Sequence, residues 1–390
     1  MTQLMEVRRR DGATFLIPSQ WGRLPEGGVH AAPVPVAGGL IVVSPEDPAG
    51  AIGAWLTDPD AAAWWLSGVF GEPVASAALA GGTGPVRVEV EWGESAAPLR
   101  RMAMGLWLHR WWPSHSEGIP RLDERLLRAE IGTAALNAEP CLPDQELASS
   151  LLGAGAAALP GALLAVNDLV GVRLEEAERL VWEAVHAVLA EGEIDADTAV
   201  ILTGLAAQRG RDDARVEAML REAENALHRP PIAPAVALAA GEPSTDDAVG
   251  RGTVDWLQVN PRHVSGGDGN VVVEESPEGD LMRLLILVGR GDETNEAGLQ
   301  ARIYLADEPI PVAQVVLVPE DMVYVGEVTI PTGVTYRIDV FDPELVSAPR
   351  FDGTPKADRD LVRDIISSRL TSPTSGPLGP FLCELLATDT

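Results

Sequence analysis

The stretch "AQVVLVPEDMVYVGEVTI", residues 313–330, places two apolar, strand-like segments on either side of Glu320 and Asp321. Further segments of the same kind lie around it, at 254–259, 281–289, 299–305 and 334–342. Clusters of Gly, Pro, Asp and Asn separate these segments at short and fairly regular intervals. Such spacing is typical of an antiparallel sandwich. We therefore predict a C-terminal antiparallel β-sandwich domain over residues 253–345.

The N-terminal part, residues 1–95, alternates short extended segments with turn signals. "MEVRRRDGATFLI" predicts two strands around the turn pair Asp11-Gly12, and residues 40–44 and 86–92 predict two more. Between these strands, Asp58 is suited to cap a short helix whose first residue is Pro59. This region is expected to be mixed α/β.

From residue 96 to residue 228 the apolar residues recur at helical intervals. The clearest case is residues 173–192, "RLEEAERLVWEAVHAVLAEG", in which apolar side chains share one face and glutamates occupy the other. Short connections favour antiparallel neighbouring helices. Residues 229–252 are rich in Pro, Ala and Gly and are interpreted as a linker.

Residues 346–390 predict one helix, at 356–370, and an apolar segment, "FLCELLA" at 381–387, that docks on a domain or on a partner. The predicted fold class is therefore α+β and multidomain. It consists of an N-terminal mixed α/β region, a central antiparallel helical block that can form one unit with residues 1–95, and the C-terminal β-sandwich.

The chain is strongly acidic, with 58 Asp and Glu against 29 Lys and Arg and a formal net charge of −29. Because phosphate backbones and anionic lipids repel carboxylates, nucleic acid is not expected as a partner. The two cysteines, Cys141 and Cys383, show no pairing pattern and are expected to be free thiols.

The N-terminus lacks an apolar signal segment followed by a small-residue cleavage site, so we expect a cytoplasmic protein of bacterial composition. Residues 147–167 form an uncharged run of membrane-spanning length. They are dominated by Ala and Gly and contain Pro160, which favours a buried helix with a break over membrane insertion.

Known catalytic motifs are absent from the sequence, including phosphate loops, the GxSxG elbow and the HExxH helix. Two acidic segments could bind a cation, but each has a simpler interpretation. "EIDAD" at 193–197 favours helix capping, and "SGGDGNVV" at 265–272 favours a hairpin loop. No cofactor and no metal site are predicted.

The segment "LWLHRWWPSHSEG", residues 106–118, gathers three tryptophans and two histidines. One interpretation is a site in which His109 and His115 meet Glu117 or Asp123, with Arg110 nearby, around a metal or as a base held by a carboxylate. The other is a buried helix that ends at Pro113 near a domain junction, because Trp and His combine apolar bodies with polar edges. Which interpretation holds depends on whether His109 and His115 converge.

Three functions remain open. The first is a cytoplasmic bacterial accessory protein without catalysis, which presents helical and sandwich surfaces to a protein partner and can form a homo-oligomer. The second is a hydrolase-like or lyase-like enzyme with a polar site near His109 and His115. The third is a structural component of a larger assembly. A membrane partner is not expected for any of them.

Overall fold

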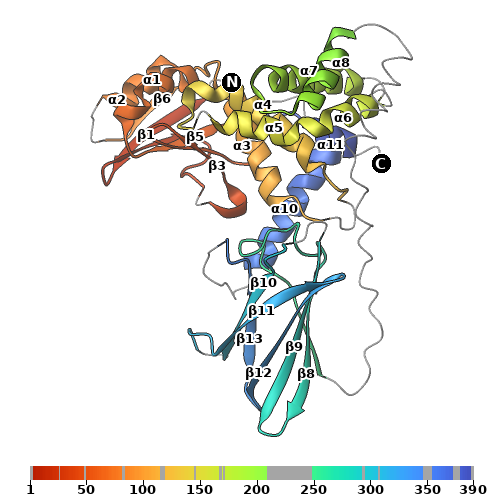
Figure 1. The fold of residues 1–390 in the computed structure, drawn as a ribbon. Coiled ribbons are helices and arrows are strands. Elements are labelled where there is room, and N and C mark those ends of the chain that lie inside the picture. The colour runs from red at the N-terminus through yellow and green to blue at the C-terminus, as the bar shows by residue number, and fades with distance from the viewer. Residues whose placement is uncertain are drawn as a thin grey trace. The chain divides into compact units, whose positions relative to one another are not determined.

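The computed structural model confirms an α+β fold built from helices and antiparallel sheets (Figure 1). The structure describes residues 3–25, 27–47, 50–80, 84–114, 119–144, 146–166, 169, 172–208, 248–291, 295–305, 308–345, 354–371 and 378–387.

These residues divide into two compact units. The first comprises the described residues of Met1–His109, Leu122–Arg229 and Ser368–Thr390, and the second those of Arg110–Arg121 and Pro230–Ser367.

The first unit contains a six-stranded antiparallel sheet with the strand order β3-β4-β5-β2-β1-β6. Its strands are β1 Leu4–Arg10, β2 Ala13–Pro18, β3 Ala32–Val36, β4 Gly39–Val43, β5 Ile52–Leu56 and β6 Val86–Glu89. The predicted hairpin is confirmed, since β1 pairs with β2 around Asp11 and Gly12. Both turn residues have positive φ, 52° and 82°, which favours Asp and Gly at these positions.

Helices make up the rest of the first unit. They are α1 Pro59–Phe70, α2 Glu72–Leu79, α3 Ala96–Trp111, of which the last two residues belong to the second unit, α4 Glu124–Ala138, α5 Glu146–Gly155, α6 Leu159–Val166, α7 Val172–Glu191, α8 Ala196–Gln208 and α11 Leu382–Ala387, with 3-10 turns at Gly28–His30, Glu139–Cys141 and Ala156–Ala158. Asp58 caps α1 as predicted, because its side chain accepts the N–H of Ala61 at 3.0 Å. Asp195 caps α8 through the N–H of Thr198 at 2.8 Å, which confirms capping as the role of "EIDAD".

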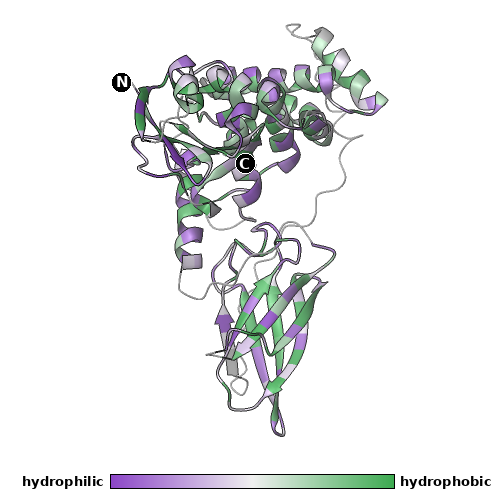
Figure 2. Ribbon diagram, turned by 90° about the vertical axis from the view of Figure 1, so that its left-hand side faces the viewer, coloured by the Kyte–Doolittle hydropathy of each residue, from purple (hydrophilic) through white to green (hydrophobic). Residues whose placement is uncertain are grey.

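The second unit contains a seven-stranded antiparallel sheet with the order β13-β10-β11-β12-β9-β8-β7. Its elements are β7 Ala248–Gly252, β8 Val271–Glu278, β9 Leu281–Gly289, β10 Leu299–Leu305, β11 Ala313–Glu320, β12 Val323–Pro331, β13 Tyr336–Phe341 and α10 Thr354–Thr371, of which the last residues belong to the first unit. Hydrophobic and hydrophilic residues alternate along the strands (Figure 2). Strands β8 to β13 all contribute buried side chains to one apolar core.

Two predictions about this part of the chain are wrong. Residues 254–259 form a turn and not a strand, because the Asp255 side chain accepts the N–H of Leu257 and its carbonyl accepts those of Gln258 and Val259. Val254, Trp256 and Val259 are nevertheless buried, which explains the strand-like pattern. The last residues of the predicted linker form β7, while residues 209–247 lie outside the described part of the chain.

The uncharged run adopts helix α5, a 3-10 turn and helix α6 in succession, so the chain stays helical through Pro160. In the described part of the chain, Glu146–Val166 is the one helical stretch long and apolar enough to cross a membrane by length and composition. Such a single stretch is weak evidence for a membrane span, because the core helix of a globular unit has the same properties.

Candidate functional site

His109 lies near the end of α3 and faces the start of α4. Its Nε2 lies 2.7 Å from Oε1 of Glu124 and 3.3 Å from Nε of Arg128, and Arg128 also pairs with Glu124. All three side chains are partly exposed. The arrangement brings an imidazole, a carboxylate and a guanidinium together at the surface of the first unit.

Two of the other predicted site residues, Asp123 and Arg110, have different partners. Asp123 caps α4, since its side chain accepts the N–H of Leu126 at 3.0 Å. Arg110 belongs to the second unit, where it donates to the carbonyl of Trp256 at 2.7 Å and stacks on the ring of Trp111. Burial lowers the pKa of Arg110 to about 10.

His115 and Glu117 lie outside the described residues, so the convergence of His109 and His115 stays a prediction. The tryptophans of the same segment behave as packing residues. Trp107, Trp111 and Trp112 are buried, and Trp107 donates its indole N–H to the carbonyl of Val29 at 2.9 Å. Among the described residues, no group of three or more His, Cys, Asp and Glu side chains could hold a metal ion.

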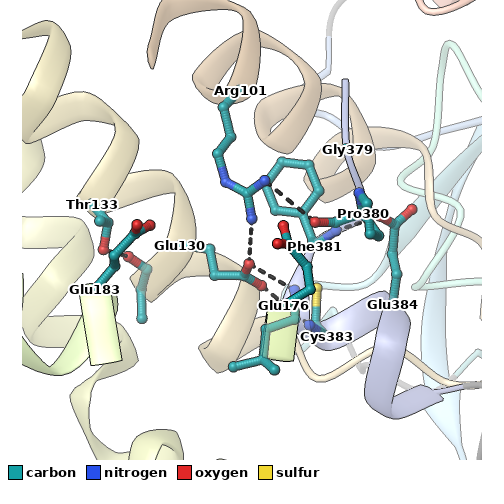
Figure 3. Close-up of polar contacts among 12 residues, drawn as sticks. Arg101, Glu130, Thr133, Glu176, Glu183, Gly379, Pro380, Phe381, Cys383 and Glu384 are labelled. Carbon is teal, nitrogen blue, oxygen red and sulfur yellow. Dashed lines mark hydrogen bonds and ion pairs between the residues drawn. The ribbon is translucent and has the colours of Figure 1, made fainter. Parts of the chain in front are cut away.

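The most elaborate polar site of the first unit surrounds the C-terminal segment, residues 378–387 (Figure 3). Glu130, in the middle of α4, is almost fully buried and accepts the backbone N–H groups of Leu382 at 2.7 Å and Cys383 at 3.1 Å. It is also paired with Arg101 of α3 at 2.8 Å. The carboxylate of one helix thus caps the first turn of another, α11.

The same segment is held from its other side by Arg369 of α10. This guanidinium binds both carboxylate oxygens of Glu384 at 2.6 Å and donates to the carbonyls of Leu378 and Gly379. Glu384 in turn accepts the backbone N–H of Phe381 at 2.8 Å. A bidentate pair of this kind fixes orientation as well as distance.

Phe381 is the apolar anchor of the segment. It is buried, and the guanidinium of Arg101 lies 4.3 Å from its ring centroid. Space for the ring depends on Gly105 of α3, because a Cβ there would lie 3.2 Å from the ring and 2.5 Å from Ile131. The prediction that residues 381–387 dock back is confirmed, since α11 packs on α4, α6 and α7.

The pKa shifts around residues 378–387 indicate a structural role for these side chains and not a catalytic one. Burial raises the pKa of the Glu130 carboxyl, although Arg101 and the two N–H groups act in the opposite direction. Burial and the neighbouring carboxylates Glu130 and Glu384 raise the pKa of the Cys383 thiol well above its ordinary range. A thiol in such surroundings is a poor nucleophile, because the thiolate is the reactive form. Cys383 and Cys141 are free thiols, as predicted, and both are buried.

A second buried polar group lies in the second unit, between the 254–259 turn and strand β13. The side-chain amide of Gln258 donates to Oδ1 of Asp339 at 2.6 Å, and the backbone N–H of Asp342 donates to the carbonyl of Gln258 at 2.8 Å. Arg302 lies 3.7 Å from Oδ2 of Asp339. Burial raises the pKa of Asp339 to about 6 despite this guanidinium.

Sequence reasoning did not identify Glu130, Arg369, Glu384, Gln258 or Asp339. For Glu130 one signal was present, because this carboxylate interrupts the apolar face of α4 between Leu127 and Ile131. For Arg369, Gln258 and Asp339 the sequence holds no local signal, since their side-chain partners lie on other segments.

Comparison of the chain with protein-family models, with curated proteins and with solved structures found no match.

Glu130→Ala should release the C-terminal segment, because it leaves two buried N–H groups and Arg101 without their acceptor. Removing one partner of a buried pair costs about 3–5 kcal/mol. We expect hydrogen exchange at Leu382 and Cys383 to accelerate and the first unit to melt earlier. The control is Glu183→Ala, which breaks only an exposed pair with Arg179 and should cost less than about 1 kcal/mol. Equal protection of both amides in the two variants would contradict this role of Glu130.

Asp339 should make stability depend on pH. Its folded-state pKa of about 6 lies above the unfolded value of about 4, so between these values the native state binds more protons than the unfolded state. Stability contributed by this group is therefore present at low pH and falls by roughly 2–3 kcal/mol as pH rises through 4 to 6.

Urea unfolding of the wild type and of Asp339→Asn between pH 4 and 7 measures this contribution as the difference between the two curves. Asp280→Asn, on an exposed turn, controls for the loss of one negative charge. If the wild-type and Asp339→Asn curves run parallel over the whole range, Asp339 does not titrate as described.

Proposed function

We propose that this chain is a cytoplasmic bacterial accessory protein that acts by binding a protein partner and not by catalysis. It is proposed to bind neither nucleic acid nor a membrane, which agrees with its net charge of −29. Three side chains with shifted pKa values support this proposal. Glu130 and Asp339 are buried and Arg110 is partly buried, and each is bonded to a neighbouring segment of the fold.

The observation that carries the proposal is an apolar row on the outer face of the N-terminal sheet. Strand pairing aligns one residue from each of four strands, namely Pro35, Leu40, Trp55 and Phe15. Trp55 is 44% exposed and stacks with Phe15 at 6.2 Å between ring centroids. Exposed apolar groups that are contiguous mark surfaces of interaction more often than isolated ones do.

We also infer that the second unit is a β-sandwich within a multidomain chain, which begins at β7 and not at residue 253 as predicted from the sequence. Strand β11 supports this architecture. Residues Ala313–Leu317 pair with β10, whereas Val318–Glu320 pair with β12, so the strand passes from one set of partners to another. Strands that change sheets in this way form the corners of sandwiches. The core shared by strands on both sides of β11 agrees with two facing layers.

Affinity capture of the full chain from the cells that express it, followed by sedimentation of the purified chain, tests the proposal. We expect a reproducible protein partner and a complex heavier than the isolated chain. The absence of any partner, together with a monomeric mass, would contradict it. A regular homopolymer of the purified chain would favour a structural component of an assembly.

The enzyme remains the second candidate because His109 lies 2.7 Å from the Glu124 carboxylate, an arrangement suited to a general base. Under the accessory proposal, His109→Ala should leave the cellular function of the chain unchanged, as should the control His186→Ala on α7. If His109→Ala alone abolished function while the fold and partner binding stayed intact, the enzyme hypothesis would replace the accessory one.

A further inference from the structure

The two edges of the N-terminal sheet differ in the backbone groups that they present. Strand β3 forms one edge of this sheet and strand β6 forms the other. In an antiparallel strand, the N–H and carbonyl groups of every second residue point away from the paired strand. At an edge these groups stay open to a further strand, which makes an edge a site for pairing with another chain.

The edge at β3 is closed to a further strand. Pro33 and Pro35 are exposed residues of β3, and the strand still pairs with β4 along its whole length. Because proline has no N–H, prolines at an edge occupy the positions that point away from the ladder. The outward N–H groups on either side of them, those of Ala31 and Ala37, already donate to carbonyls of two 3-10 turns at 3.5 and 3.1 Å. An added strand would therefore find no donor here.

The edge at β6 is open. The N–H of Val90 donates to the carbonyl of Gln3 at 2.9 Å, which sets the alternation of hydrogen bonds between β6 and β1. The backbone groups of the even-numbered residues of β6 consequently face β1, and those of Arg87 and Glu89 face outward. Within the part of the chain that the structure describes, neither of these two outward N–H groups has an acceptor. A further strand would meet two donors and two acceptors.

Charged side chains on the outer face of this edge are balanced in sign. Arg87 is 72% exposed at its side chain, and its Nε lies 3.7 Å from Glu6, a carboxylate that also pairs with Arg8. Glu89 is exposed and forms no ion pair with any described residue. Two arginines thus accompany two glutamates. Since the whole chain carries a net charge of −29, this edge is a place where two copies can approach without net repulsion.

Symmetry selects one register for the pairing of two copies. A two-fold axis through Val88 places Arg87 opposite Glu89 of the second copy, and Glu89 opposite its Arg87. Each of these pairs would exchange two backbone hydrogen bonds and add an attraction between opposite charges. On the other face of the strand, Val86 would meet Val90 of the second copy. An axis through Arg87 or Glu89 would set like charges directly opposite, which is destabilising.

We propose that strand β6 pairs with the β6 strand of a second copy, so that two N-terminal sheets join into one continuous sheet. The dimer is closed, because both far edges of the joined sheet are β3 strands that accept no further strand. This inference goes beyond the proposed function, which concerns a different protein as partner. Since the pairing covers few residues, the dimer is weaker than a standard interface, with an expected Kd of about 10–100 μM.

Sedimentation equilibrium of the purified full chain, from about 1 μM to about 1 mM, measures the self-association. We expect a monomer–dimer equilibrium without larger species. Glu89→Pro should weaken the dimer by roughly tenfold or more, because it removes one outward donor, as prolines do at the other edge. Its melting temperature should stay close to that of the wild type, since this N–H has no acceptor among the described residues of the chain.

Two charge reversals test the register. Arg87→Glu makes both positions acidic and Glu89→Arg makes both basic, so each variant alone should dimerise roughly tenfold or more weakly than the wild type. An equimolar mixture of the two should recover the dimer as a heterodimer, because every glutamate at these positions then faces an arginine. Asp280→Arg, on an exposed turn of the second unit, is the matched control and should dimerise as the wild type does.

Three results would overturn the inference. The first is a wild type that stays monomeric up to about 1 mM. The second is a dimer that Glu89→Pro and both charge reversals leave unchanged, since it would use another surface. The third is a series of masses beyond the dimer, because the edges at β3 would then not be closed.

Capture of a different protein separates this inference from the proposed function. If the purified chain is monomeric but captures a partner, the accessory function stands and the inference fails. If the wild type dimerises through β6 but captures no other protein, the inference stands and the accessory function fails. If Glu89→Pro is monomeric and captures the same partner as the wild type, both stand, and the dimer and the partner use different surfaces.

Discussion

The first unit depends on one buried carboxylate. Glu130 lies within α4, yet its hydrogen bonds go to the backbone N–H groups of α11 and to Arg101 of α3. A charge so deeply buried is tolerated only when all its partners are present, because an isolated carboxylate would lose its hydration without compensation. The carboxylate therefore couples three segments that are distant in sequence. The C-terminal segment becomes part of the core of the unit and not a tail.

The second unit also contains a buried carboxylate, Asp339, which accepts a hydrogen bond from the side-chain amide of Gln258. The 254–259 turn is bonded to strand β13 and to the residue that follows it, Asp342. The side chain of Asp255 caps the turn from within, and Gln258 links it to Asp339 and Asp342. Burial of the Asp339 carboxyl raises its pKa to about 6. Arginines contribute stacking as well as charge, as Arg302 does on Phe341.

Local features of the sequence were predictable where the deciding interaction is local. Asp58 and Asp195 cap helices because each accepts a hydrogen bond from an N–H three residues further along. Asp11 and Gly12 form a hairpin turn because they tolerate positive φ. The 254–259 segment was misread because burial and not strand pairing determines its apolar pattern. For His109 the sequence indicated a carboxylate partner, but the structure places Glu124 beside this histidine, while Asp123 caps α4.

The sequence by itself indicated the α+β class, helices such as α1, α7 and α10, strands such as β1, β2 and β9, two free thiols, and a last apolar segment that docks either on a domain or on a partner. These follow from periodicity, capping and turn chemistry, which act within a few residues. Only the tertiary structure decided that Glu130 caps a helix about 250 residues away, that His109 and Arg110 serve different units, and that valines of β11 remain exposed. The reason is physical: pairing of buried charges and exposure of a sheet face depend on which segments the fold brings together, and no local pattern encodes that choice.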